Sequence, residues 1–193
     1  MIAVTLVFSF GESIVFIGVL IPGSVVIILL GGLTASQSVF VFAGVMMSAL
    51  VGSILGDLVS FFWGRRVDRS GKLPSKVYTP SLVDKGRRFF NKLGGITIFL
   101  GRFVGPVRGI VSFVAGMMQY RTGKFMIYNS LGGVMWTVLH VGAGRMAGKN
   151  WHLAEERLGK TSLYLILILV LIIIVYSQFQ NIKKIFGESG KKQ

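Results

Sequence analysis

Long apolar runs alternate with short basic segments along almost the whole chain. Residues 13–33 carry no charge, residues 37–63 carry only Asp57, and residues 161–179 carry none. A further apolar helix is expected over about 125–144. Crossing about 30 Å of hydrocarbon takes about 20 residues of helix. The pattern therefore predicts an all-α polytopic membrane protein with about three spanning helices, forming one membrane domain over residues 1–193.

Helix-breaking residues interrupt two of the apolar segments. Pro22-Gly23 lies inside the first segment, and Gly105-Pro106 lies in the middle of another. Proline removes a backbone donor and glycine tolerates chain reversal, so each segment is better described as two half-helices than as one rod. We therefore expect two re-entrant helical hairpins, over about residues 8–34 and 93–120.

The distribution of positive charge favours a second hairpin that turns back rather than crosses. If it turns back, 15 Lys and Arg lie on the side of the basic loop 65–92 and four on the other side, with the motif arginines counted as intramembrane. If it crosses, the counts are 13 and six. Cytoplasmic loops carry the excess of Lys and Arg, so the basic loop and the C-terminal tail are expected to face the cytoplasm.

A weak internal repeat relates the two broken segments. Aligning Pro22 with Pro106 places Ser24 opposite Arg108 and Gly32 opposite Gly116. Each broken segment is followed by a long helix, and an odd number of crossings between them would make the repeat inverted. Broken helices that meet near the midplane in inverted repeats form the binding sites of many transporters. The residues assigned to the hairpin breaks are Pro22, Gly23, Gly105, Pro106 and Gly116.

The basic loop contains a candidate interfacial helix. The sequence PSLVDKGRRFFNKL, from Pro80 to Leu93, has Ser81 and Asp84 in capping-box spacing, followed by apolar positions on one helical face. A short amphipathic helix in the headgroup region and an ordinary surface helix both fit this pattern.

Composition narrows the class of partner. Apolar residues make up 52% of the chain, and the net charge is +14. The basic residues are spread through loops and do not form a stripe with interleaved aromatic residues, so we expect anionic or phosphate lipid headgroups as partners and no nucleic acid. Cysteine is absent, which excludes disulfides and thiolate metal sites. No HExxH, GxSxG or phosphate-cradling lysine loop occurs, so we expect neither a metal, a cofactor nor an enzyme.

Four ionisable residues fall at membrane depth: Glu12, Asp57, Arg102 and Arg108. A charge facing lipid costs about 3 kcal/mol there, so these side chains are expected to face the protein interior or an aqueous cavity, and one another. They are either two buried ion pairs that lock the hairpins, or a site kept for a task. The second interpretation is favoured because buried ion pairs stabilise poorly compared with apolar packing.

The motif GRFVGPVRG at 101–109 places Arg102 and Arg108 on either side of the break. Free amides at a helix start favour anions, and guanidinium forks bind phosphate oxygens in two-pronged fashion. The sequence therefore predicts that both arginines bind a phosphate-bearing headgroup. Glu12 and Asp57 would hold the arginines in the empty site, or take up protons.

Other polar residues are weaker candidates. Asn129 and Trp136 either line the cavity or knit helices together, and the second role is favoured. His140 and His152 are interpreted as packing or interfacial residues.

These residues together resemble the DedA superfamily of membrane proteins, which is related to the eukaryotic VTT-domain lipid scramblases. The resemblance runs from about residue 10 to 140 and is carried by Glu12, Pro22-Gly23, GDLVSFFWGRR at 56–66, GRFVGPVRGIVSFVAGMMQY at 101–120, Asn129, Gly132 and Trp136. It implies two facing re-entrant hairpins, and acidic and basic residues essential for transport. It also implies a bacterial cytoplasmic (inner) membrane protein that moves lipids such as undecaprenyl phosphate or phospholipids between leaflets. Many members carry an acid directly after the first Pro-Gly, where this chain has Ser24, which leaves Glu12 and Asp57 as the candidate carboxylates.

Three functions follow as hypotheses. The leading one is a flippase-like or scramblase-like lipid transporter whose substrate-binding residues are Arg102, Arg108, Glu12, Asp57 and Ser24. The alternative is a proton-coupled ion or drug antiporter that uses Glu12 and Asp57. A membrane enzyme acting on lipid phosphates is the least favoured, because no nucleophile is evident.

The absence of native cysteines allows a direct test of the second hairpin. Single cysteines at Ser81 and Tyr120 are expected to react with a membrane-impermeant thiol reagent from the same side of the membrane, because a re-entrant segment returns to the side it left. Labelling from opposite sides would show that residues 93–120 cross the membrane.

Overall fold

A computed structural model of the chain describes residues 1–15, 17, 18, 23–70, 87, 88, 90–103 and 107–150. Within these ranges every regular element is an α-helix, as the apolar pattern predicts. The helices are α1 (Ile2–Ser13), α2 (Gly23–Leu33), α3 (Val39–Ser70), α5 (Ile96–Gly101), α6 (Val107–Met117) and α7 (Thr122–Lys149). The predicted span 161–179, most of the candidate interfacial helix, and the breaking residues Pro22, Gly105 and Pro106 lie outside the described residues.

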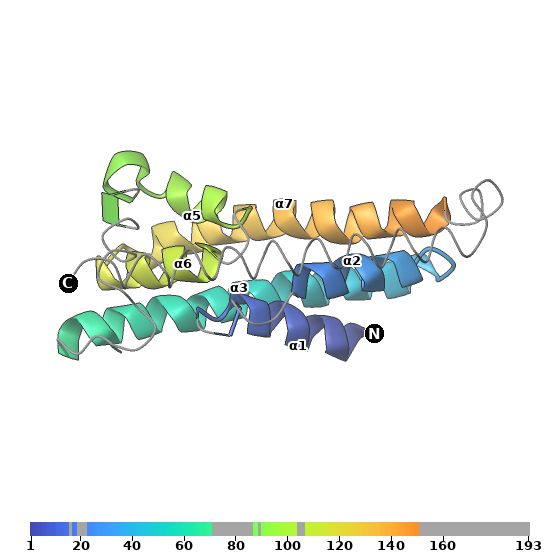
Figure 1. Cartoon of the computed structure of the whole chain (residues 1–193), viewed down its shortest axis with the longest axis horizontal. Coiled ribbons are helices and arrows are strands. Elements are labelled where there is room, and N and C mark those ends of the chain that lie inside the picture. Colours follow the sequence, from blue (N-terminus) through green and yellow to red (C-terminus); the bar gives the residue numbers. More distant parts are fainter. Residues whose placement is uncertain (16, 19–22, 71–86, 89, 104–106, 151–193) are drawn as a thin grey trace, which may run out of the picture.

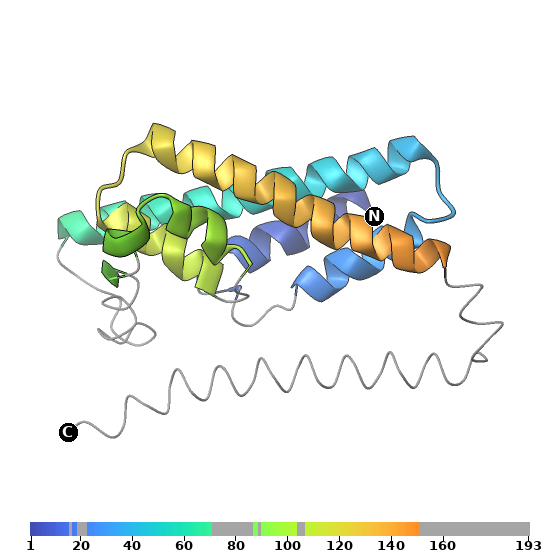
Figure 2. The same cartoon turned by 90° about the horizontal axis from the view of Figure 1, so that it is seen from above.

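The two long helices frame the molecule. Figures 1 and 2 show α3 and α7 running the length of the bundle, with the short helices arranged along them. Both are longer than the sequence predicts, since α3 has 32 residues and α7 has 28. Of the helices in the described part of the chain, one, Val39–Val67, is long and apolar enough to cross a membrane by itself.

The short helices form two pairs, α1 with α2 and α5 with α6, and each pair is called a hairpin below. In Figure 1, α1 and α2 occupy one end of the bundle and α5 and α6 the other. The start of α6 lies against the residues that follow α1, because a Cβ on Gly109, in α6, would lie 2.7 Å from the Cα of Val15. Val15 also packs with Ile110 in a buried cluster.

The first break lies earlier than the sequence predicts. The apolar run 13–33 suggests half-helices on either side of Pro22, but α1 already ends at Ser13 and α2 begins at Gly23. Ile14 takes an extended conformation (ψ 129°), while the Ser13 hydroxyl donates to the Ser9 carbonyl and satisfies an acceptor of the last turn. The first leg of this hairpin is therefore residues 2–13, a segment that the sequence analysis leaves largely unassigned.

The second leg of each hairpin packs against the long helix of the other half. Helix α1 contacts α3, which follows it in the chain, but α2 packs on α7. In the same way α5 contacts α7, and α6 packs on α3. An inverted repeat of the units α1–α3 and α5–α7 would give this pattern of contacts.

Glycine residues let α6 approach α3 closely, and let α2 approach α7 closely. A Cβ on Gly116 would lie 1.9 Å from the carbonyl oxygen of Phe61, and a Cβ on Gly144 would lie 2.1 Å from that of Ile28. The sequence assigns Gly116 to the hairpin breaks, but it lies inside α6, where the absence of a side chain lets α6 approach α3. Close approach through small residues is the usual way that membrane helices associate, because lipid removes the hydrophobic drive between them.

Hydrogen bonds from α3 fix the connection between α6 and α7. Arg65 Nη2 donates to the Tyr120 carbonyl oxygen at 2.6 Å, and its Nη1 donates to the Thr122 hydroxyl at 3.0 Å. Burial raises the pKa of the Tyr120 hydroxyl above its usual value, and the nearby Tyr128 raises it further. The base of the second hairpin is thereby tied to α3.

The α6–α3 crossing gives a stability prediction. Gly116→Ala is expected to destabilise the protein by about 1–3 kcal/mol, because the new methyl group would overlap the backbone of α3. Thermal unfolding in detergent measures the change. Gly142→Ala, also inside a helix, is the matched control, since nothing lies within 4 Å of the Cβ position there. Equal stability of the two variants would contradict the close crossing.

Candidate functional site

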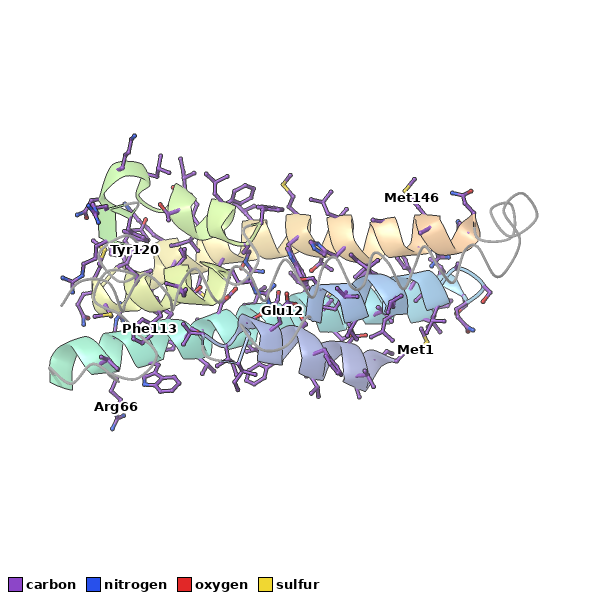
Figure 3. All side chains as sticks on the ribbon, in the orientation of Figure 1. Met1, Glu12, Arg66, Phe113, Tyr120 and Met146 are labelled. Atoms are coloured by element: carbon purple, nitrogen blue, oxygen red, sulfur yellow. The ribbon has the colours of Figure 1, made fainter. Side chains whose placement is uncertain are left out.

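The four ionisable residues at membrane depth gather where the two hairpins meet. Figure 3 labels Glu12 near mid-length of the bundle, between the end with Met1 and Met146 and the end with Arg66 and Tyr120. Asp57, Arg102 and Arg108 are 1%, 2% and 3% exposed. Asp57 interacts electrostatically with both arginines. The predicted gathering of opposite charges is therefore present in this arrangement.

Arg102 is fully engaged by neighbours on α3 and α7. Its Nη2 donates to Oδ2 of Asp57 and, at 2.6 Å, to Oδ1 of Asn129. Its Nη1 donates to the Ser53 hydroxyl at 3.2 Å, and its Nε donates to Asn129 at 3.3 Å. Gly132 provides the space for this side chain, since a Cβ there would lie 2.8 Å from Cδ of Arg102. Every nitrogen of this guanidinium has a protein partner.

Arg108 has a different environment from Arg102, although it lies only six residues after it in the chain. Its Nη2 donates to the hydroxyl of Ser13 and to the Ser9 carbonyl oxygen at 3.2 Å. Its Nε and Nη1 are buried and have no hydrogen-bond partner. Among the described residues no carboxylate forms an ion pair with it; the ion pair found there joins Arg102 to Asp57. Arg108 therefore keeps two donors without a hydrogen-bond partner and has no direct ion pair among the described residues.

The position of Arg108 adds to its positive field. It is the second residue of α6, an 11-residue helix. The start of a helix carries about half a positive charge, so helix and guanidinium both favour an anion at this place. Cζ of Arg108 also lies 4.8 Å from the centroid of the Trp136 ring, whose face attracts cations.

Glu12 is held within the first hairpin. Its Oε1 accepts a hydrogen bond from the Ser24 hydroxyl on α2. Its Oε2 is buried without a partner. Gly23 leaves room for the carboxylate, because a Cβ there would lie 2.6 Å from Oε2. The sequence predicts that the acids pair with the arginines; Asp57 does so with Arg102, whereas Glu12 bonds to Ser24.

Trp136 knits helices together, the role that the sequence favours, and it also contacts the charged residues. It packs in a buried cluster with Ile27, Val45 and Val141, which join α2, α3 and α7. It also faces Arg108 and stacks on the ring of His140, with 4.3 Å between centroids and 26° between planes. Asn129, fully buried, belongs to the site through Arg102.

Sequence reasoning did not assign three further residues of this site. Ser9 and Ser13 lie four apart on α1 and both contact Arg108, while His140 lies one helical turn after Trp136. The i, i+4 spacing of each pair places its members on one helical face. Ser13 directly follows Glu12, and Ser9 lies one turn earlier on the same helical face. Hydroxyl groups on one face beside an acid in an apolar segment are the sequence signal for these two serines.

Comparison with known proteins now identifies the family. The sequence profile of the VTT domain matches residues 21–146. The chain belongs to the VTT domain family. Its relatives include proteins named DedA and YabI, which place this VTT domain in the DedA superfamily of membrane proteins.

Three relatives illustrate the range of names in the family. An alkaline phosphatase-like protein of Lactococcus lactis is 32% identical over 153 residues, which are 75% of this chain and 72% of the relative. The inner membrane protein YabI of Escherichia coli is 33% identical over 77% of this chain and 58% of its own length. Protein DedA of Escherichia coli is 32% identical over 76% of this chain and 68% of its own. No solved structure gives a significant match to this VTT domain.

The buried Arg102–Asp57 ion pair leads to a prediction about stability. Asp57→Asn is expected to lower the free energy of unfolding by about 3–5 kcal/mol, because it leaves the buried Arg102 charge without an anion. Denaturant titration in detergent measures this loss.

A double variant serves as the control. Asp57→Leu combined with Arg102→Met removes both charges, and is expected to recover most of the stability that the single change loses, since apolar residues replace buried pairs at little cost. A single variant as stable as the wild type would show that the pair does not hold the second hairpin in place.

Proposed function

We propose that this VTT domain moves a phosphate-bearing lipid, such as undecaprenyl phosphate or a phospholipid, between the leaflets of the bacterial cytoplasmic membrane. The headgroup phosphate binds Arg108 where the hairpins meet, while the acyl or prenyl chains stay in the bilayer. The observation that carries the proposal is the pair of buried, unpartnered nitrogens on Arg108. A buried charged donor without a partner is costly, so its retention favours a ligand that completes the hydrogen bonds.

The helix lengths support re-entrant hairpins in this proposal. Helices α1 and α2 have 12 and 11 residues. At 1.5 Å per residue each is about 17 Å long, a little more than half of the roughly 30 Å of hydrocarbon. Hairpins of this length, entering from opposite faces, bring Glu12 and Arg108 near the midplane. In this orientation the basic loop and the C-terminal tail face the cytoplasm, as the charge distribution predicts.

The two arginines divide the work. Arg102 is saturated by Asp57, Asn129 and Ser53 and positions the tip of the second hairpin. Arg108 offers Nε and Nη1, which lie on different edges of the planar guanidinium and provide charged donors for phosphate oxygens. A headgroup that enters between the hairpins thus replaces the missing acceptors of Arg108 without displacing Asp57.

The antiporter hypothesis has one observation in its favour. Oε2 of Glu12 is buried without a partner, so Glu12 is an available proton acceptor. Proton flux in vesicles, measured with and without added phosphate lipid, separates the two functions. Flux that does not depend on the lipid would favour the antiporter. Release of inorganic phosphate in the same assay would favour an enzyme, as the name of the Lactococcus relative suggests for that protein.

Arg108→Lys tests the transporter directly. The change keeps the charge but removes the planar set of donors, and is expected to reduce lipid translocation in reconstituted vesicles at least about tenfold, the effect of losing one charge-assisted hydrogen bond. Arg145→Lys is the matched control, because Arg145 also lies against an aromatic ring (Phe42, 4.3 Å) but not where the hairpins meet. Normal translocation by Arg108→Lys would overturn the assignment of the phosphate to this residue.

A further inference from the structure

A half-buried histidine lies beside the anion site, and no role has yet been assigned to it. His140, on α7, stacks on Trp136, the same ring that faces Arg108. The His140 ring interacts electrostatically with Glu12 of α1 and with Arg108 of α6. The guanidinium and the imidazole therefore share one indole ring, and the Glu12 carboxylate lies within electrostatic range of the imidazole.

The backbone fixes which ring nitrogen of His140 is open. Nδ1 lies 2.9 Å from the carbonyl oxygen of Trp136. A carbonyl oxygen only accepts, so Nδ1 carries the hydrogen in this contact and Nε2 of the neutral ring keeps its lone pair. The free lone pair is the place where a proton adds.

The charge of the empty site is balanced without His140. Glu12 and Asp57 offset Arg102 and Arg108, and the Arg102–Asp57 pair is closed by hydrogen bonds. A phosphate that binds Arg108 brings at least one extra negative charge into a region of low dielectric, where uncompensated charge is expensive. The site then favours the uptake of one positive charge close to the anion.

His140 is the group able to supply that charge. Of the helices packed against α7, α2 contributes no titratable residue, and α5 is followed by Arg102, which is paired with Asp57 of α3. Arg65 of α3 bonds to Tyr120 and Thr122, at the start of α7. Arg108 and His140 contact the same indole ring, so an imidazolium there would lie close to the guanidinium charge. An anion on Arg108 offsets that charge, and the Trp136 face stabilises an imidazolium.

We propose that His140 is the proton site coupled to the anion site, so that phosphate binding to Arg108 and proton binding to Nε2 of His140 favour each other. The step breaks one O–H bond of a hydronium ion and forms the Nε2–H bond, which leaves a water molecule and a ring with a single positive charge. By linkage, the proton strengthens phosphate binding by the same factor as phosphate strengthens proton binding. The inference rests on the proposed function, since it requires a phosphate on Arg108.

Histidine NMR tests the coupling in the full chain. The sequence contains two histidines, so His152→Gln leaves His140 as the sole reporter. In this background, purified in detergent and held near pH 6.5, the imidazolium fraction of His140 is expected to rise about twofold when dodecyl phosphate is added. In Arg108→Gln the same addition is expected to leave the fraction unchanged, whereas Arg145→Gln responds like the wild type.

Calorimetric binding of dodecyl phosphate distinguishes failure of the inference from failure of the function. Binding that depends on Arg108, with no change in the His140 signal, would overturn the coupling and leave the proposed function standing. No binding to the wild type would overturn both. Inorganic phosphate is the second arm: a response to dodecyl phosphate alone supports a lipid headgroup as the source, and an equal response to both supports coupling to free phosphate.

Transport gives a readout that loss of packing would not change. Lipid translocation by the wild type is expected to be about fivefold faster at pH 6 than at pH 8, and His140→Gln is expected to lose this ratio, because its side chain takes up no proton. A purely structural role would lower the rate of His140→Gln equally at both pH values and keep the ratio, which would overturn the proposal.

Discussion

The buried pair of Arg102 and Asp57 is the interaction on which the arrangement of the centre depends. A guanidinium in this position has no bulk water, so the protein must supply its solvation from α3 and α7. Asp57, Asn129 and Ser53 do so together, and Gly132 leaves the space that they surround. Because these groups come from both α3 and α7, they hold Arg102, at the end of α5, against both long helices. Its contribution is positional, since buried ion pairs add little net stability.

The two halves share an arrangement of helices but not their chemistry. Each half supplies a hairpin and a long helix, and each second leg crosses to the other half. At equivalent places the first hairpin carries Ser24 and the second carries Arg108. The first hairpin thus brings an acid with a hydroxyl partner, and the second brings a cation with open donors. The centre therefore has an acid on the side of the first hairpin and a cation on the side of the second, although the helices of the two hairpins are arranged alike.

Much of this could be predicted from the sequence, because it depends on residues that break a strong local pattern. Membrane-depth charges and the motif around Arg102 and Arg108 stand out against apolar surroundings, and the all-helical class follows from the apolar runs. The end of α1 could not be predicted, since Ser60 of α3 bonds to Ser13 and Val15 there, while Pro22 is the stronger local signal. The hydrogen-bond partner of each charged residue could not be predicted from the sequence either. Whether Glu12 bonds to Ser24 or to an arginine depends on how α1 lies against α2, and no local preference encodes that.

Because Gly116 lies within α6, at the crossing with α3, it limits how the two halves can move relative to each other. At Gly116 the backbone of α6 contacts that of α3, and at Gly144 the backbone of α7 contacts that of α2. Each half thus contacts the long helix of the other half. The halves are therefore interlocked, and they cannot separate as rigid bodies unless both glycine contacts open together. Any movement that opens the centre would therefore require bending of the hairpins within an intact frame.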